Sequence, residues 1–266
     1  MSYRFYSPKT GNVQNDTQWD GRTLDGELAA FSGRSLVAVF DKYLSGRKAK
    51  IIEAGCGLGA WCEWFKRRGH DVVGLEYLED VVKRAKSFTP GSSVVRGDVT
   101  NIDYGNGTFD AYVSLGVIEH FEDGPEKALS EAFRVLKPGG LAFITVPVLT
   151  PFRRFIAHPV RDIYFLLNKL RNRQAFFWEY RYTPDELRGY VEKAGFETLE
   201  EGFDDYERWV NDRHLGLCGD WFFLRKKSGG MWELNRAGML CLGLLKMIFP
   251  SSWYCAGWLV VARVRK

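Results

Sequence analysis

Short runs of aliphatic and β-branched residues alternate with helical patterns along the first half of the chain. The apolar runs are AKIIEAG, DVVGLEY, SVVRGDV, FDAYVSLGV and LAFITVPV. Between them, AWCEWFKRRG, LEDVVKRAKSF and PEKALSEAFRVLKPGG carry apolar residues at three- and four-residue intervals, which indicates amphipathic helices. Strands joined by crossover helices pair in parallel. The pattern therefore predicts a doubly wound α/β sheet.

Further elements are predicted on both sides of this core. Apolar residues at helical spacing predict one helix from Thr23 to Tyr43, and a second helix over Val160–Leu170. The segment TPDELRGYVEKAGF, which begins at Thr183, combines an N-cap threonine, a first-turn proline and a capping-box glutamate, so it predicts a helix with a defined start. Strands are expected at Glu197–Phe203 and at GWLVVARV, close to the end of the chain.

Composition excludes several classes of protein. The 266 residues are 45% hydrophobic and 26% charged, which is incompatible with extended disorder. A net charge of +4, from 37 basic and 33 acidic residues, is too balanced to predict a nucleic-acid partner. The uncharged stretch Met247–Ala262 is too short to span a bilayer. The start of the chain has no apolar run behind basic residues, so we expect a cytoplasmic protein.

The cysteines do not form a metal-binding pattern. They are odd in number and lack the paired CxxC spacing of a structural zinc site. We therefore expect reduced thiols and no metal. The five positions are Cys56, Cys62, Cys218, Cys241 and Cys255.

A glycine-rich turn follows the first strand of the core, in the sequence IIEAGCGLG that ends at Gly59. Gly55, Gly57 and Gly59 allow the backbone to approach a ligand closely, and the helix that follows offers free amides at its N-terminus. The same glycines fit the relaxed dinucleotide fingerprint. On this motif alone, a nicotinamide-dependent oxidoreductase is an alternative.

Acidic residues end three successive strands and narrow the choice of ligand. Glu53 precedes the first glycine, where it would repel a diphosphate and attract a cation. Glu76 ends the second strand at the position expected for ribose hydroxyls. Asp98 ends the third strand, where it can accept a hydrogen bond from an adenine amino group beside Val99. Together the three carboxylates favour a positively charged adenosine ligand without phosphate.

In this order, the motifs resemble those of the class I S-adenosylmethionine-dependent methyltransferases, in particular the broad group that includes ubiquinone-biosynthesis O-methyltransferases. The matching elements are EAGCGLG, LEYLEDVVKRAK, GDV, FDAYVSLGVIEHF, EAFRVLKPGGLAFITVP and YTPDELRGYVEKAGFE. The resemblance covers about Ile51 to Phe203 and the closing strand. It implies a seven-stranded, mostly parallel sheet of order 3-2-1-4-5-7-6 with strand 7 antiparallel.

The resemblance also implies a cofactor and its binding residues. The cofactor is S-adenosyl-L-methionine, which leaves as S-adenosyl-L-homocysteine, and Arg22 or Arg34 would bind its carboxylate. The implied cofactor-binding residues are Glu53, Gly55, Gly57, Gly59, Glu76, Tyr77, Asp98, Val99, Leu115 and Gly116.

Methyl transfer from a sulfonium mainly requires a nucleophile held in line and a site closed to water. The resemblance implies O-methylation of a small or lipid-linked acceptor, with His120 in VIEHF as general base or as a structural residue. Some quinone-type relatives have an acidic residue before the Glu-His pair of VIEHF and use a divalent metal. In this chain Gly116 occupies that position. A non-catalytic cofactor-binding module is a further alternative.

The segments outside the core should determine the acceptor. We divide the chain into 1–50 as an N-terminal helical segment, 51–150 as the cofactor-binding core, 151–182 as a cap insertion, 183–203 as a core helix and strand, 204–254 as a second insertion, and 255–266 as the closing strand. The aromatic residues of the cap would line an acceptor pocket or form its own core. Its arginines would bind an anionic acceptor, meet anionic lipid or form a solvated basic face. These arginines are Arg153, Arg154, Arg161, Arg171 and Arg173.

The second insertion combines bulky apolar residues, in WFFL and MLCLGLLKMIFPSSW, with the basic cluster Arg225, Lys226 and Lys227. Such a segment would contact a membrane surface, hold a lipid-linked acceptor, or pack against the sheet. No nucleic acid is expected as partner.

Overall fold

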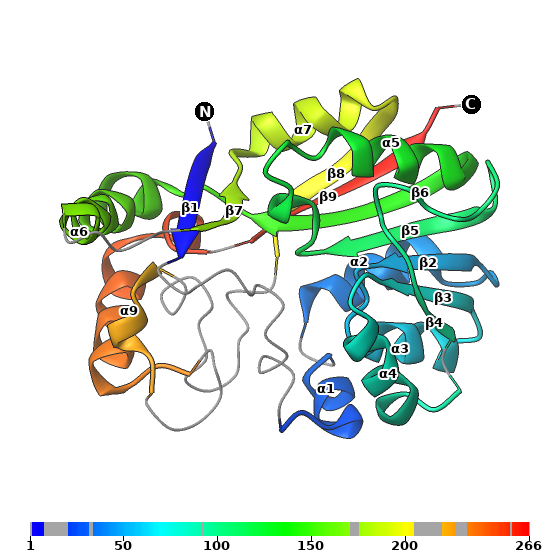
Figure 1. Ribbon diagram of the computed structural model, residues 1–266, viewed down its shortest axis with the longest axis horizontal. Coiled ribbons are helices and arrows are strands. Elements are labelled where there is room, and N and C mark those ends of the chain that lie inside the picture. Colours follow the sequence, from blue (N-terminus) through cyan, green and yellow to red (C-terminus); the bar gives the residue numbers. More distant parts are fainter. Residues whose placement is uncertain are drawn as a thin grey trace.

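The computed structural model describes residues 2–7, 21–31, 34–91, 93–170, 176–204, 220–226, 233–255 and 257–265. Its centre is a seven-stranded sheet of order β4-β3-β2-β5-β6-β9-β8, in which β9 runs antiparallel to both neighbours and the remaining pairs are parallel (Figure 1). The strands are β2 (Lys50–Ala54), β3 (Asp71–Glu76), β4 (Ser93–Arg96), β5 (Phe109–Leu115), β6 (Leu136–Pro147), β8 (Phe196–Phe203) and β9 (Gly257–Val264). The predicted fold and strand order are confirmed.

Helices cover both faces of the sheet because the central strands are apolar on both sides. Ile51 and Ile52 are both fully buried, but they belong to different hydrophobic clusters, since successive side chains of a strand point to opposite faces. Figure 1 shows one pair of helices above the sheet and the helices of the first half of the core below it. The first pair is α5 (Glu126–Val135) and α7 (Pro184–Lys193), and the others are α1 (Leu24–Phe31), α2 (Ser35–Leu44), α3 (Ala60–Arg67) and α4 (Glu79–Phe88).

Most of the predicted elements form where the local pattern placed them. The capping box of α7 is present, since the Thr183 hydroxyl accepts from the Glu186 amide and the Glu186 carboxylate accepts from the Thr183 amide. The single helix expected from Thr23 to Tyr43 is wrong, because the chain forms α1 and α2 instead. Arg34 has an extended backbone and occupies the N-cap position of α2. Glycine next to it lowers the helix propensity of this stretch.

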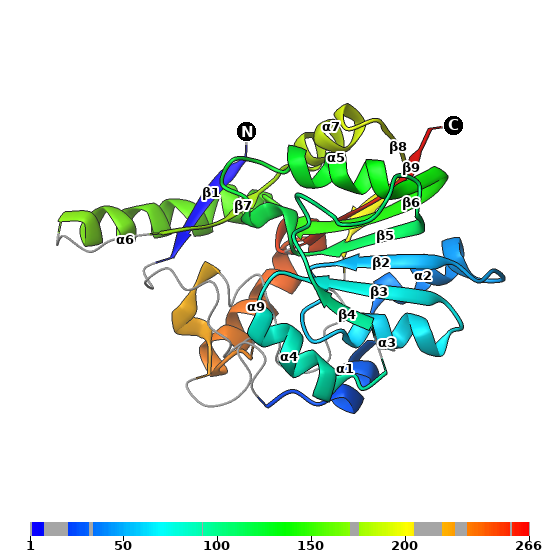
Figure 2. The ribbon, with the colours of Figure 1, turned by 45° about the vertical axis from the view of Figure 1, so that its right-hand side comes forward.

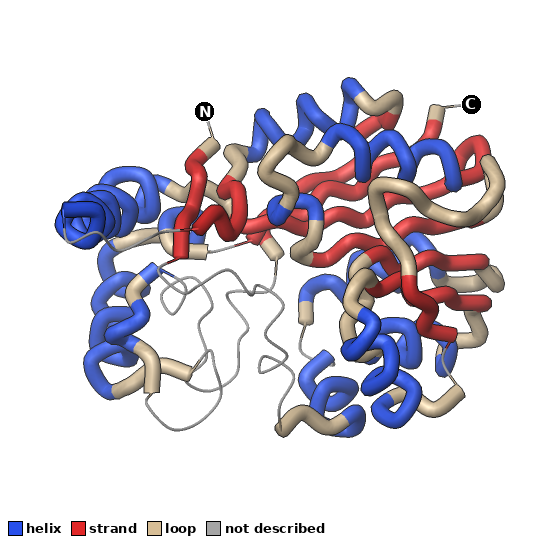
Figure 3. The backbone as a smooth tube through the Cα atoms, in the orientation of Figure 1, coloured by secondary structure: helices blue, strands red, loops and turns tan. Residues whose placement is uncertain are grey.

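The sequence had indicated a helical segment over 1–50, but its described part also contains a strand. It contains β1 (Tyr3–Ser7), which pairs antiparallel with β7 (Phe176–Arg181) in a two-stranded sheet. Figure 3 shows this pair beside the end of the large sheet. The partner of β1 lies in the cap insertion, so no local pattern indicated the pairing. The consequence is that the start of the chain is part of the cap.

The described parts of the two insertions form a helical cap at one end of the sheet. After β6 the chain forms a π-helical turn, η3 (Arg153–Ala157), and then α6 (His158–Leu170), which projects from the molecule in Figure 2. In the second insertion, η4 (Phe222–Leu224), α9 (Arg236–Ile248) and η5 (Ser251–Trp253) pack with η3 around the buried residues Phe152, Leu234 and Leu242. None of the described helices has the length and apolar character needed to cross a membrane.

Candidate functional site

A cavity of about 320 Å³ opens at the carboxyl ends of β2, β5 and β6. Ligands bind at this edge in open α/β sheets because the strand ends and the loops that follow leave a crevice there. The residues that line it come from the glycine turn, from α1 and from three strand ends. They include Arg22, Glu27, Phe31, Arg34, Glu53, Gly55, Leu58, Trp61, Phe88, Leu115, Gly116, Glu119, Thr145, Pro147, Asp204 and Gly257.

The glycine turn brings backbone to the wall of this cavity. Gly55 has φ +74°, and a Cβ atom there would lie 2.5 Å from Cγ2 of Val117, so no larger residue fits without displacement. Its amide donates to the Leu75 carbonyl at 2.7 Å, which ties the turn to β3. Gly59, also at positive φ, starts α3, whose first amides therefore face the turn. The glycine turn thus has the backbone geometry that a ligand cradle at this position would need.

Glu53 is a buried carboxyl group in the cavity lining. Its Oε2 accepts a hydrogen bond from Sγ of Cys62 at 2.9 Å. Burial raises the pKa of Glu53 to about 8, because the ionised form loses its hydration. A ligand cation beside it would restore the charged form. The side chain is thus suited to an ammonium group, as the sequence indicated.

Two arginines bring positive charge to the same cavity. Arg22 Nη1 lies 3.2 Å from Oε1 of Glu27, and the Arg34 guanidinium lies 5.4 Å from the centre of the Trp61 ring. Both residues line the cavity, so the two candidates for binding a ligand carboxylate lie in the same site as Glu53. The combination matches the two opposite charges of an amino-acid group.

Glu76 and Asp98 lie on the neighbouring strands and outside the cavity lining. Glu76 accepts hydrogen bonds from the Gly57 amide at 3.0 Å and the Leu78 amide at 2.9 Å. Asp98 Oδ1 accepts from the amide and the hydroxyl of Thr100, at 2.8 and 2.7 Å. Glu76 is therefore oriented by the backbone of the glycine turn, and Asp98 by the residues that follow it. The two carboxylates lie at successive strand ends, as predicted.

The predicted residues thus fall into two groups. Glu53, Gly55, Leu115 and Gly116 line the cavity, whereas the others lie outside its lining. Tyr77 is 59% exposed, and Val99 is buried in the core on the side of α5. The residues outside the lining are Gly57, Gly59, Glu76, Tyr77, Asp98, Val99 and His120.

Glu119 is the site residue that sequence reasoning missed. It lines the cavity, is only 2% exposed, and its Oε2 has no hydrogen-bond partner among the described residues. Burial raises its pKa to about 7. The neighbouring His120 donates from Nδ1 to the Trp178 carbonyl at 2.6 Å, so Nε2 is left to accept a proton and lies 3.9 Å from Oε1 of Glu119. The VIEHF motif indicated that this position belongs to the site. It did not indicate that Glu119, rather than His120, is the buried side chain.

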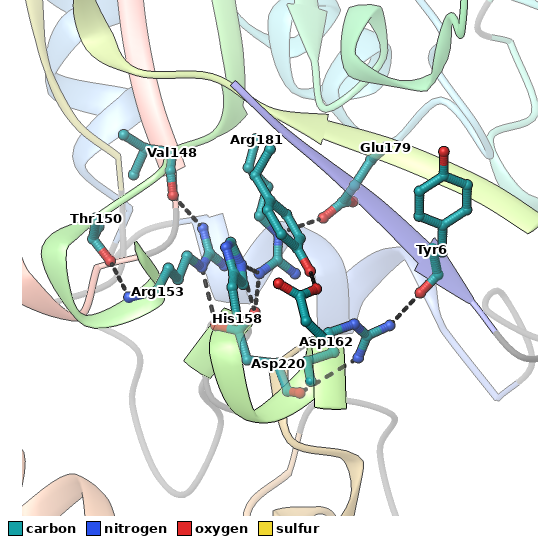
Figure 4. A network of polar contacts seen from close by, with 11 residues as sticks. Tyr6, Val148, Thr150, Arg153, His158, Asp162, Glu179, Arg181 and Asp220 are labelled. Atoms are coloured by element: carbon teal, nitrogen blue, oxygen red, sulfur yellow. Dashed lines mark hydrogen bonds and ion pairs between the residues drawn. The ribbon is translucent and has the colours of Figure 1, made fainter. Parts of the chain in front are cut away.

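Two of the cap arginines, Arg153 and Arg161, are not part of a solvated basic face, whereas Arg154 is exposed. Arg153 is buried and pairs with Asp220, while Arg161 donates to the Tyr6 carbonyl and lies over the Phe5 ring (Figure 4). The aromatic residues of the described cap do not line the cavity. Arg171, Arg173, Cys218 and Lys227 lie outside the described residues.

Comparison with known proteins identifies the core. Residues 52–144, from β2 into β6, match the family model described as a methyltransferase domain. Residues 52–144 thus form a methyltransferase domain, and the chain is similar to class I S-adenosylmethionine-dependent methyltransferases. This confirms the predicted family and its cofactor, and it favours them over the nicotinamide alternative.

Individual relatives agree with this family. The chain is 31% identical over 147 residues to a probable S-adenosylmethionine-dependent methyltransferase of Mycolicibacterium smegmatis, which covers 55% of this chain and 51% of that protein. It is 34% identical over 204 residues to the chloroplastic 2-methyl-6-phytyl-1,4-hydroquinone methyltransferase 1 of Oryza sativa, covering 74% of this chain and 53% of that protein. The chain thus spans about half the length of these relatives.

A solved structure supports the fold. A crystal structure of a protein of Methanosarcina mazei, described as an S-adenosylmethionine-dependent methyltransferase, superposes with a TM-score of 0.58 at 15% identity. The superposition covers 85% of this chain and 97% of that one. At this identity the similarity concerns the fold alone.

Proposed function

We propose that this protein transfers a methyl group from S-adenosylmethionine to a hydroxyl group of a small or lipid-linked acceptor. The observation that carries the proposal is Glu119, a buried carboxyl group with an unpaired oxygen in the cavity beside the glycine turn. A buried carboxyl with a pKa of about 7 is matched to accepting a proton near neutral pH.

The residues of the site fit the cofactor from end to end. Glu76 would accept from the ribose hydroxyls, Asp98 from the adenine amino group, and Glu53 would face the ammonium group. One of the two cavity arginines, Arg22 or Arg34, would bind the carboxylate. When bound, the cofactor supplies an electrophilic methyl group on a sulfonium.

Glu119 and His120 would handle the proton of the acceptor. In its ionised form Glu119 accepts the hydroxyl proton as the oxygen becomes nucleophilic. His120 Nε2 lies 3.9 Å away and is partly exposed, so it can pass the proton to solvent. His120 is then a catalytic residue through this second step. Glu119 itself is shielded from bulk solvent, since it is only 2% exposed.

A lipid-linked aromatic acceptor is consistent with the name of one relative. The Oryza sativa protein is named for a hydroquinone that carries a phytyl chain, that is, an aromatic ring with hydroxyl groups and an apolar tail. We place the protein in the cytoplasm at a membrane surface, where such an acceptor resides. The cap, which follows directly after the cavity residue Pro147, would receive it.

Calorimetry and a transfer assay test the proposal. S-adenosylhomocysteine should bind tightly and a nicotinamide dinucleotide should not. With methyl-labelled cofactor, a hydroquinone that carries an isoprenoid tail should be methylated faster than the same ring without a tail. Tight dinucleotide binding without S-adenosylhomocysteine binding would contradict the methyltransferase. Cofactor binding without transfer to any hydroxyl compound would favour the non-catalytic module.

A further inference from the structure

Two helices of the cap expose several large apolar side chains to solvent. They are α6 and α9, each of 13 residues. Both lie at the same end of the molecule, away from the strands of the large sheet (Figures 1 and 2). A helix on the surface of a globular protein normally turns its apolar side inward. These two helices do so only in part.

Helix α6 exposes apolar residues along most of its length. Leu170 is 75% exposed, and the exposed positions recur at three- and four-residue intervals. The preceding turn η3 adds Phe155, which is 69% exposed. The exposed apolar residues of α6 are Val160, Ile163, Tyr164, Leu166, Leu167 and Leu170.

Helix α9 is apolar on both sides. One side, with Gly238, Leu242 and Leu245, is buried against η3 and η4. The other side exposes Met239, Leu240, Leu244, Met247 and Ile248, of which Met247 is 82% exposed. Helix α9 therefore packs against the rest of the cap on one side only and leaves its other side exposed.

The charges next to these apolar residues are mainly positive. Arg236 and Lys246 are exposed on α9, which contains no acidic residue, and Arg154 is exposed in η3. The one acidic residue of η3 and α6, Asp162, accepts a hydrogen bond from the Tyr3 hydroxyl at 2.5 Å. Apolar side chains bordered by cations are the combination that binds an anionic lipid surface.

The base of α6 is fixed to the rest of the molecule by a buried polar network (Figure 4). Arg153 donates to Asp220 at 3.0 Å and to the Val148 carbonyl at 2.6 Å, and Arg181 of β7 pairs with the same aspartate. His158, the first residue of α6, stacks on Tyr3 at 3.7 Å. The network holds α6 so that its apolar residues remain outside.

We propose that α6 and α9 form a docking surface for an anionic lipid bilayer, with both helices lying in the plane of the membrane interface. The proposal rests on the proposed function, because a membrane surface is where a lipid-linked acceptor would be found. Its test, however, does not depend on methyl transfer. A second copy of the chain fits less well. A twofold dimer through this surface would bring Arg236 and Lys246 close to the same cations of the partner.

Vesicle co-sedimentation tests the surface with the full chain. The protein should bind vesicles of phosphatidylglycerol and phosphatidylcholine in equal parts, bind pure phosphatidylcholine less, and bind the mixed vesicles less as salt rises. The double variant Leu166→Glu/Leu170→Glu should bind at least about tenfold more weakly, since it removes two exposed apolar side chains from the interface. Both positions are exposed, so neither change removes core packing.

Lys193→Glu is the matched control. It changes the net charge by the same two units, but on an exposed position of α7, outside the surface. It should leave vesicle binding near the wild-type level, and S-adenosylhomocysteine binding should be equal in all three proteins. Equal vesicle binding by the double variant and wild type, or a wild-type dimer that the double variant converts to monomer, would overturn the docking surface. If the wild type does not bind S-adenosylhomocysteine, the proposed function is contradicted instead.

Discussion

Glu119 Oε1 lies 3.9 Å from Nε2 of His120, and the two side chains differ sharply in exposure: 3% for the glutamate and 33% for the histidine. The carboxylate faces the cavity and the imidazole lies toward solvent. Burial raises the pKa of Glu119 to about 7. The partly exposed His120 lies between this carboxyl group and solvent. This pair is the basis of the first prediction.

Glu119→Gln should lower kcat by about 100-fold or more, because an amide cannot accept the acceptor proton. Cofactor binding should change little, since the amide keeps the size of the side chain. His120→Asn should cost less, because solvent can replace the second proton carrier. Steady-state kinetics and calorimetry separate the two effects. A Gln variant with kcat close to wild type would exclude Glu119 as general base.

The pH profile of the wild type should report the same group. Only the ionised carboxylate accepts a proton, so kcat should rise as the pH rises through about 7 and then level off. In Glu119→Gln the residual rate should lack this step. A wild-type rate that is flat across this range would show that another group carries the proton.

Cofactor affinity should also increase with pH, through Glu53. Its folded-state pKa is raised to about 8, so at neutral pH much of the carboxyl is protonated and must release a proton to pair with the ligand ammonium. Binding should strengthen as the pH rises toward about 8. Calorimetry in buffers of different ionisation enthalpy should show proton release. Glu53→Gln should remove both effects, whereas the exposed Glu192→Gln serves as a control that keeps them.

Glu76→Ala and Asp98→Ala should each weaken S-adenosylhomocysteine binding by about tenfold or more, because each loses a charged hydrogen-bond acceptor for the nucleoside. The fold should remain intact, as judged by circular dichroism. Glu192→Ala, on the exposed side of α7, is the matched control. If both variants bind as tightly as the wild type, the nucleoside lies elsewhere.

Asp220→Ala should destabilise the cap by about 3 to 5 kcal/mol, because it leaves Arg153 and Arg181 buried without their common counter-charge. Burial favours the neutral acid, yet the two arginines hold the pKa of Asp220 well below its usual range. The stabilisation is therefore present at neutral pH and is lost on acidification. Urea unfolding measures the change, and a loss below about 1 kcal/mol would contradict the network's structural role.

Local patterns in the sequence were sufficient for the core of this protein. The alternation of strands and helices, the glycine turn ending at Gly59 and the capping box at Thr183 each depend on neighbours along the chain. The acidic strand ends Glu76 and Asp98 also follow from local order, because successive parallel strands end at the same edge of the sheet.

The tertiary structure decided what depends on distant segments. The pairing of β1 with β7, the ion pair between Arg153 and Asp220, and the contact of His120 with the Trp178 carbonyl join parts far apart in the sequence. Periodicity shows which side of an element is apolar, but it cannot show what packs against a charged side chain. Burial by other segments, and with it the raised pKa of Glu119, comes only with the folded chain.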